Sequence, residues 1–134
     1  MKVKCRTISR GCAEGQVLIT RDTISFLGNV DPKTGKVVDA NHELFGRSIK
    51  DKVLVFPHGK GSTVGSYVIY QLFKNGVAPA AMINLESEPI VAVGAIISAI
   101  PLVDRLEKDP YSILMDGMCI KVNSSEGYVE VTEG

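Results

Sequence analysis

The sequence lacks an excess of charge of either sign. It contains 15 Lys and Arg against 15 Asp and Glu, so its formal net charge is zero. A surface that binds nucleic acid needs an excess of basic side chains on one face, and disordered chains usually carry unbalanced charge. The charge balance therefore excludes a generally basic nucleic-acid surface and favours a folded domain.

Long hydrophobic runs are also missing. The longest one, Ile90 to Ile100, is interrupted by Gly94 and Ser98, whereas a helix needs about 20 apolar residues to cross a bilayer. No apolar segment of signal-peptide length follows the basic N-terminus. We therefore expect a soluble, cytoplasmic protein that does not associate with membranes.

Cysteine is scarce. The chain has Cys5, Cys12 and Cys119, and none of them belongs to a Cys-x-x-Cys pair. An odd number of cysteines without a pattern indicates reduced thiols in a reducing compartment. An iron–sulfur cluster usually takes several of its ligands from one short motif. The sequence therefore predicts buried thiols, and no cluster ligands, in this chain.

Apolar residues, by contrast, are abundant enough for a core, at 45% of the sequence. A chain of 134 residues has the size of one domain and buries about two thirds of its unfolded surface, without the help of disulfides or a structural metal. No linker-like segment interrupts it, so we expect a single domain over residues 1–134.

The spacing of apolar residues predicts two main helices, one over residues 64–74 and one from Pro89 to about Ser98. A short helical turn is predicted at residues 41–44. The predicted strands cover residues 3–8, 16–20, 52–56, 80–84, 100–103, 118–123 and 128–132. This order of elements predicts a mixed α/β fold with a central β-sheet or barrel flanked by helices.

One glycine-rich loop carries the most chemistry. It opens the first helix and reads Pro57-His-Gly-Lys-Gly-Ser-Thr63. The first N–H groups of a helix lack internal partners and carry the positive end of the helix dipole, so they form a site for an anion. Lys60 adds a positive charge, and Ser62, Thr63 and Ser66 add hydroxyl groups around the same point.

The known phosphate-binding motifs do not match this loop. The nucleotide P-loop places its Lys directly after the last glycine, and the dinucleotide motif spaces its third glycine differently. Here Lys60 precedes Gly61, and the third glycine is Gly65. The loop therefore predicts anion binding but neither ATP nor NAD. The simpler alternative is that Ser62 or Thr63 only caps the helix behind a tight turn.

Other polar residues carry weaker signals. His42 and His58 have no Cys or carboxylate at metal-ligand spacing. Asn84 and Asp104 stand at the ends of predicted strands, where open α/β sheets place their ligand contacts.

Several segments of the chain resemble the small, swivel-domain subunit of the aconitase X family. They are Lys52-Val-Leu-Val-Phe-Pro57, Gly59-Lys-Gly-Ser-Thr-Val-Gly-Ser-Tyr67, Ala78-Pro-Ala-Ala81, Glu88-Pro-Ile-Val-Ala-Val-Gly-Ala-Ile-Ile97 and Ile100-Pro-Leu-Val-Asp104. The resemblance covers nearly the whole chain, and the loop with Ser62 is its most specific part. A free-standing chain of this length is similar to the two-subunit members of the family.

The resemblance implies a swivelling β/β/α domain and a dehydratase (hydro-lyase) reaction on a small phosphorylated hydroxy acid. It also implies an iron–sulfur cluster, expected to be 4Fe-4S, that is bound by a large subunit, so that this chain binds no cofactor alone and is active only with that partner. Ser62 matches the family's catalytic serine, which implies a role as the base. The implied substrate-binding residues surround it and are Lys60, Gly61, Thr63, Val64, Gly65 and Ser66, and Lys60 either holds the negative charge of the substrate or stabilises the anion of Ser62.

Other functions stay open at this point. The same loop suits a non-catalytic binding module for a phosphorylated metabolite, or a dehydratase subunit for another hydroxy acid. A phosphohistidine carrier of swivelling architecture needs a histidine at the start of the helix, and here His58 lies before Gly59 while Ser62 occupies that point.

Overall fold

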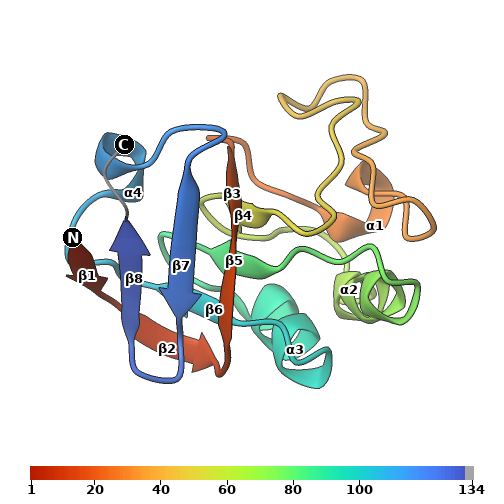
Figure 1. The fold of residues 1–134 in the computed structure, drawn as a ribbon. Helices are drawn as coiled ribbons and strands as arrows, with labels where there is room; N and C mark the ends of the chain where they lie inside the picture. Colours follow the sequence, from red (N-terminus) through yellow and green to blue (C-terminus); the bar gives the residue numbers. More distant parts are fainter. Residues whose placement is uncertain (132–134) are drawn as a thin grey trace.

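The computed structural model describes residues 1–131, which form one curved sheet of eight strands (Figure 1). The strands follow the order β1-β8-β7-β3-β4-β5-β6-β2 across the sheet. Their bounds are β1 Lys2–Lys4, β2 Arg6–Ser9, β3 Cys12–Ile19, β4 Val53–Val55, β5 Ala81–Ile83, β6 Leu102–Asp104, β7 Cys119–Asn123 and β8 Tyr128–Val131. The four strands β3 to β6 are parallel, and the outer pairs are antiparallel.

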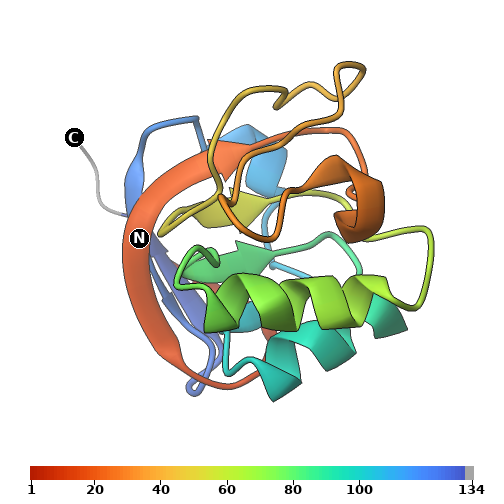
Figure 2. The ribbon, with the colours of Figure 1, turned by 90° about the vertical axis from the view of Figure 1, so that its right-hand side faces the viewer.

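The two end strands of the sheet, β1 and β2, are neighbours in the sequence. Only Cys5 separates them, and its backbone N–H donates to the carbonyl oxygen of Gly127 at 3.0 Å. The sheet must therefore curl until its two ends meet, and its curvature is visible in Figure 2, where β3 follows a long arc. The result is a barrel-like sheet, as the sequence predicted.

Two helices cover one face of the parallel strands (Figure 2). They are α2, Gly65–Lys74, and α3, Pro89–Ile97. They pack closely because Gly94 of α3 has no side chain, and a Cβ there would lie 2.6 Å from Cδ1 of Ile69. Two short helices, α1 (Phe26–Asn29) and α4 (Pro110–Ile113), lie in the connections.

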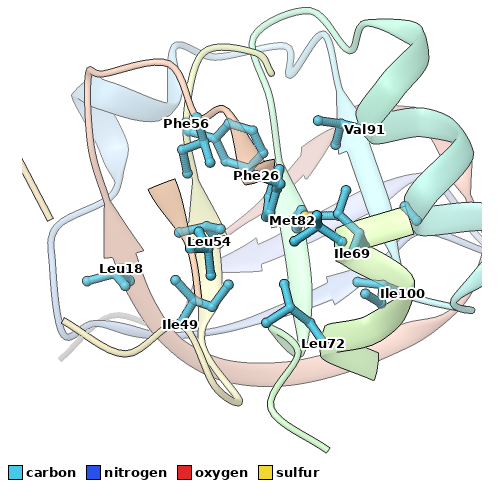
Figure 3. Packing of buried hydrophobic residues seen from close by; sticks show 14 of the residues in the cluster. Leu18, Phe26, Ile49, Leu54, Phe56, Ile69, Leu72, Met82, Val91 and Ile100 are labelled. Atoms are coloured by element: carbon cyan, nitrogen blue, oxygen red, sulfur yellow. The ribbon is translucent and has the colours of Figure 1, made fainter. Parts of the chain in front are cut away.

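The strands separate two hydrophobic clusters because successive side chains of a strand point to opposite faces. Leu54 and Met82 belong to the cluster under α2 and α3, together with Phe26, Phe56 and the helix residues shown in Figure 3. Their strand neighbours Val53, Val55, Ala81 and Ile83 pack on the other side, inside the curved sheet.

Most of the predicted elements are confirmed, including the fold class and the order of strands and helices. The prediction of one strand over residues 3–8 is wrong, since β1 and β2 pair with different neighbours. Residues 41–44 form hydrogen-bonded turns at the predicted helical turn, and neither α1 nor α4 was predicted. No helix among residues 1–131 is both long and apolar enough to span a membrane.

The prediction of buried thiols is wrong for two of the three cysteines. Cys12 and Cys119 are exposed because they occupy solvent-facing positions of β3 and β7. Cys5 is half-buried, and burial, together with the nearby carboxylate of Asp104, raises its pKa to about 11.

Candidate functional site

The parallel strands bring several connections to one edge of the sheet. Ile19, Val55, Ile83 and Val103 are in register across β3 to β6, so the four carboxyl ends lie side by side. Open α/β sheets bind ligands at this edge. It carries the loop of residues 57–64, which leads from β4 to α2 and contains the predicted site.

The first part of this loop is held by backbone pairing with a segment far away in sequence. Ile24 and Gly59 form an isolated parallel bridge. The N–H of Lys60 donates to the carbonyl oxygen of Ile24 at 3.1 Å, and the N–H of Ile24 donates to that of His58 at 3.4 Å. The path of the loop up to Lys60 is therefore fixed by the chain that precedes α1.

Two glycines of the loop are required by close contacts. A Cβ on Gly59 would collide with the side chain of Val91 and lie 2.5 Å from Oε1 of Glu88. A Cβ on Gly61 would collide with Oγ of Ser25, and the φ of Gly61 is +93°, in the region that favours glycine. At Gly59 and at Gly61, just before Ser62, the loop backbone therefore lies in direct contact with side chains of other segments.

Ser62 lies exposed just before α2. Its Oγ accepts a hydrogen bond from the N–H of Val64 at 3.2 Å, and its carbonyl oxygen accepts one from Gly65 at 2.9 Å. The regular part of α2 starts at Gly65, and the bond from the Val64 N–H to the Ser62 hydroxyl has the geometry of a side-chain cap on the turn that opens the helix. The structure thus gives Ser62 the capping bond of the simpler alternative and leaves its hydroxyl exposed, so a role in ligand binding stays a prediction.

Three consecutive N–H groups of the loop are left unsatisfied. Those of Gly61, Ser62 and Thr63 have no acceptor among residues 1–131, and all three residues are exposed. Neighbouring backbone N–H groups in such a turn form a concave site for an anion. The free donors thus belong to the loop before α2, whereas the first N–H groups of the helix, which the sequence predicted as the donors, are bonded within the chain, as those of Val64 and Gly65 show.

Lys60 is exposed and makes no ion pair within residues 1–131. Its side chain lines a polar cavity of about 260 Å³ beside the loop. The other residues around this cavity are Asp22, Thr23, Asn29, Asp39, Asn41 and His42.

The remaining predicted residues divide into two groups. Val64 is exposed beside Ser62. Gly65 is buried, and a Cβ on it would lie 3.0 Å from the side chain of Ile90. The hydroxyl of Ser66 donates to the carbonyl oxygen of Ile90 at 2.7 Å. Gly65 and Ser66 thus join α2 to α3, and their predicted contact with a substrate stays a prediction.

The connection from β5 to α3, residues 84–88, lies at the same edge. Buried Asn84 donates from Nδ2 to the carbonyl oxygen of Phe56 at 3.1 Å and accepts from the hydroxyl of Ser87 at 3.1 Å. Glu88 caps α3 by accepting from the N–H groups of Ile90 and Val91 at 2.9 and 2.7 Å. These polar groups are satisfied within the chain.

Asp104, at the end of β6, holds this second connection. Its carboxylate is fully buried and accepts two bonds from Arg6, at 2.8 and 2.7 Å, and one from the N–H of Ser87 at 2.7 Å. Burial alone would raise the pKa of Asp104, but the hydrogen bonds from Arg6 and Ser87 outweigh it and hold the pKa below its usual value. Sequence analysis placed Asp104 at a strand end but missed Arg6 as its partner.

The cysteines do not fit an iron–sulfur cluster. Cys12 pairs with Asn123 and Cys119 with Gln16, so the two thiols stand four residues apart along β3, or about 13 Å. No group of three or more His, Cys, Asp or Glu side chains among residues 1–131 is arranged to hold a metal ion.

The curved mixed sheet, the helix pair on one face and the open glycine loop define a swivel-type β/β/α domain with its loop at the surface. A family model described as the aconitase X swivel domain matches residues 2–131. The chain belongs to this family, as its sequence motifs indicated.

Similar proteins cover almost the whole chain. The phosphomevalonate dehydratase small subunits of Methanosarcina mazei and Methanosarcina acetivorans are 74% and 73% identical to it, over 98% of this chain and 91% of each relative. The crystal structure of Thermococcus kodakaraensis aconitase X in its holo-form matches with a TM-score of 0.93 at 54% identity, over 99% of both chains. A solution NMR structure of a UPF0107 protein matches with a TM-score of 0.89 at 50% identity, over 99% of this chain and 100% of that one.

Proposed function

We propose that this chain is the small subunit of a phosphomevalonate dehydratase. The enzyme removes water from (R)-5-phosphomevalonate and forms trans-anhydromevalonate 5-phosphate, a step of the archaeal mevalonate route to isoprenoids, in the cytoplasm. The proposal is supported by the names of relatives that share up to 74% of their residues with it and by the open loop around Ser62.

Ser62 acts as the base in this proposal. Dehydration breaks the C2–H bond and the C3–O bond, forms a C2–C3 double bond and releases water, so one group must accept the C2 proton. A serine hydroxyl is a weak base, and its oxygen anion needs stabilisation. The unsatisfied N–H groups of Gly61 and Thr63 and the charge of Lys60 lie next to it in the chain.

The residues around Ser62 bind the substrate. Lys60 and the loop N–H groups face the negative charges of a phosphorylated hydroxy acid. Thr63 and Val64 form the exposed rim of the pocket, while Gly65 and Ser66 fix its floor by joining α2 to α3.

A large partner subunit completes the enzyme. The relatives are called small subunits, which implies a larger one. Members of the aconitase X family are related to iron–sulfur enzymes, and the cysteines of this chain do not fit a cluster. We therefore assign the cluster, expected to be 4Fe-4S, to the large subunit, and derive no step through it.

One observation carries the proposal: the loop of residues 57–64 presents three unsatisfied N–H groups and an exposed serine at the sheet edge where such folds bind ligands. Nothing in residues 1–131 covers Ser62, which is exposed. Such a loop is half of a site, and a second polypeptide supplies the other half.

Reconstitution tests this proposal. The chain is co-expressed with the large subunit encoded in the same genome, purified without oxygen and assayed with (R)-5-phosphomevalonate, and the product is followed by mass spectrometry. We expect product from the complex and none from either subunit alone. Turnover by the isolated small chain, or a complex that dehydrates other hydroxy acids but not phosphomevalonate, would contradict it.

A non-catalytic binding module is the second candidate, because the same three N–H groups suit any phosphorylated ligand. Calorimetric titration of the isolated chain with phosphomevalonate separates the two. Tight binding without the partner, together with an inactive complex, would favour the binding module.

A further inference from the structure

We propose that Asn29 and Asp39 form a positioning pair that fixes the backbone under Gly61 and Ser62 and thereby sets the rate of the dehydration. The inference rests on the proposed function, but its structural part is measurable without it. From the sequence, Asn29 could line a site or merely form a turn and Asp39 reads as a turn residue, and both lie at least 20 positions before Ser62.

The pair is built around a buried amide. Asn29 is 9% exposed. Its Oδ1 accepts from the N–H of Ser25 at 2.8 Å, and its Nδ2 donates to a carboxylate oxygen of Asp39 at 2.8 Å. The amide has only one orientation that satisfies both bonds, because a carboxylate cannot donate and an N–H cannot accept. The second oxygen of Asp39 accepts from the N–H of Asn41 at 2.9 Å.

Ser25 passes this constraint on to the loop. Its Oγ lies directly against Gly61, where any Cβ would collide with it, and donates to the carbonyl oxygen of Leu27 at 3.0 Å. The preceding residue, Ile24, accepts from the N–H of Lys60 at 3.1 Å. The stretch of Ile24 and Ser25 is therefore the surface on which Lys60 and Gly61 rest.

This surface has little support from regular secondary structure. Inside α1, Leu27 has φ and ψ of −75° and 109°, and Gly28 has a φ of 105°, so the helix is interrupted. The backbone bond from Asn29 to the carbonyl oxygen of Ser25, at 2.9 Å, spans the interruption. The Asn29 side chain adds the bond that holds the N–H of Ser25, so the position of Ser25 depends on it.

The pair also borders the polar cavity that Lys60 lines. Asn29, Asp39 and Lys60 all line this cavity, which has a volume of about 260 Å³. A shift of the pair therefore displaces the base of the loop. Catalytic groups that move by about 1 Å lose about a hundredfold in rate.

The central test is a swap of the two side chains in the reconstituted complex. Asn29→Asp sets a carboxylate against that of Asp39, and we expect kcat to fall about ten- to a hundredfold, with KM and affinity for the large subunit within about threefold. The double variant Asn29→Asp with Asp39→Asn restores an acceptor for Ser25 and a donor between the two positions. It should return kcat to within about threefold of the original chain.

A matched control lies at the opposite edge of the sheet. Asn123 accepts from the N–H of Glu126 at 3.1 Å and donates from Nδ2 to the Glu126 carboxylate at 3.2 Å, which is the same chemistry as at Asn29. Asn123→Asp should leave kcat within about threefold. Asp39→Ala, which removes the acceptor without adding repulsion, is the second variant in case Asn29→Asp fails to fold, and it should lower kcat about tenfold.

NMR on the isolated chain gives a readout that does not depend on activity. Asn29→Asp should speed the hydrogen exchange of the Lys60 N–H and shift the amide resonances of Gly61 and Ser62, and the double variant should reverse both changes. The positioning role would be overturned if Asn29→Asp and Asp39→Ala kept normal kcat and unchanged loop resonances. It would also be overturned if the double variant failed to restore kcat and the loop resonances. Loop changes with an original complex that cannot dehydrate phosphomevalonate would instead overturn the proposed function.

Discussion

Two connections leave neighbouring parallel strands at the same edge of the sheet and enter the two packed helices, yet they are built in opposite ways. The connection of residues 84–88 satisfies most of its polar groups internally, through Glu88 on α3 and the buried Asp104. The connection of residues 57–64 makes one side-chain bond at the start of α2, from the N–H of Val64 to the hydroxyl of Ser62, and leaves the N–H groups of Gly61, Ser62 and Thr63 without acceptors in residues 1–131.

The difference separates a connection that stabilises the fold from the connection to which we assign the proposed site. A polar group that already has its partners adds to stability but offers nothing to a ligand. A polar group without a partner adds little to the stability of the isolated fold, but it can form a hydrogen bond with a ligand. Substitutions of Lys60, Ser62 and Thr63 should therefore change activity more than stability, and those in residues 84–88 and their contacts should do the reverse.

The largest expected effect is that of Ser62→Ala. Removing the proposed base should lower kcat of the complex by about 10³-fold, while the thermal midpoint of the chain and its binding to the large subunit stay the same. Steady-state assays and calorimetry measure both. Ser125→Ala is the control, since Ser125 is exposed at the other edge and accepts only from the N–H of Gly11. Near-normal turnover of Ser62→Ala would remove Ser62 from the chemistry.

Asp104→Asn should give the largest loss of stability. The buried carboxylate loses its charge and with it the strength of its bonds to Arg6 and Ser87, which we expect to lower the free energy of unfolding by about 2 kcal/mol at pH 7. Chemical denaturation measures it. Asp116→Asn is the control, because Asp116 and its partner Arg47 are exposed, and it should change stability by less than about 1 kcal/mol.

The same variant has a defined pH dependence. The pKa of Asp104 is lowered in the folded chain, so its contribution is complete above the ordinary carboxyl pKa of about 3.9 and disappears as the pH falls through the lower folded value. The difference between Asp104→Asn and the original chain should shrink below about pH 4. A difference that grows toward acid would mean that the carboxylate is not stabilised by its partners.

Lys60→Ala should have an intermediate effect. Without the positive charge, KM for phosphomevalonate should rise about tenfold, and stability should be unchanged because Lys60 makes no ion pair within residues 1–131. Lys33→Ala, at an exposed turn position, serves as the control. Should both KM and kcat stay at the original values, Lys60 has no part in the site.

The smallest effect is expected from Glu88→Ala. The loss of the cap on α3 should lower the free energy of unfolding by about 1 kcal/mol, whereas kcat should fall less than in any variant of Ser62. Glu107→Ala, at an exposed position outside the helices, is the control. A large loss of kcat with no loss of stability would contradict the assignment of residues 84–88 to stability and of residues 57–64 to activity.

Local pattern was enough to predict most of the fold. The helical spacing around α2, the Glu88-Pro89 start of α3 and the apolar runs of β4 and β5 are written in short stretches, and the structure confirms them. The split of residues 3–8 into β1 and β2 could not be predicted, since it depends on which distant strands lie at the two ends of the sheet. The exposure of Cys12 and Cys119 depends on the same closure.

The candidate site was predictable only in part, for the same reason. The glycines, Lys60 and Ser62 form one continuous motif, so the loop was found from its own residues. The contacts that shape it come from elsewhere: Ser25 against Gly61, and Asn29 with Asp39 behind Ser25. Nothing in their spacing marks them as neighbours of the loop.

The sequence by itself determined the mixed α/β architecture and the chemistry of the loop, because both depend on residue types within a few positions of one another. Only the tertiary structure decided in which of the two connections, residues 57–64 or residues 84–88, the polar groups find hydrogen-bond partners. Those outcomes depend on partners that approach from β1–β2, α1 and β6, and a hydrogen bond or a buried ion pair forms only where the fold brings the two groups within about 3 Å.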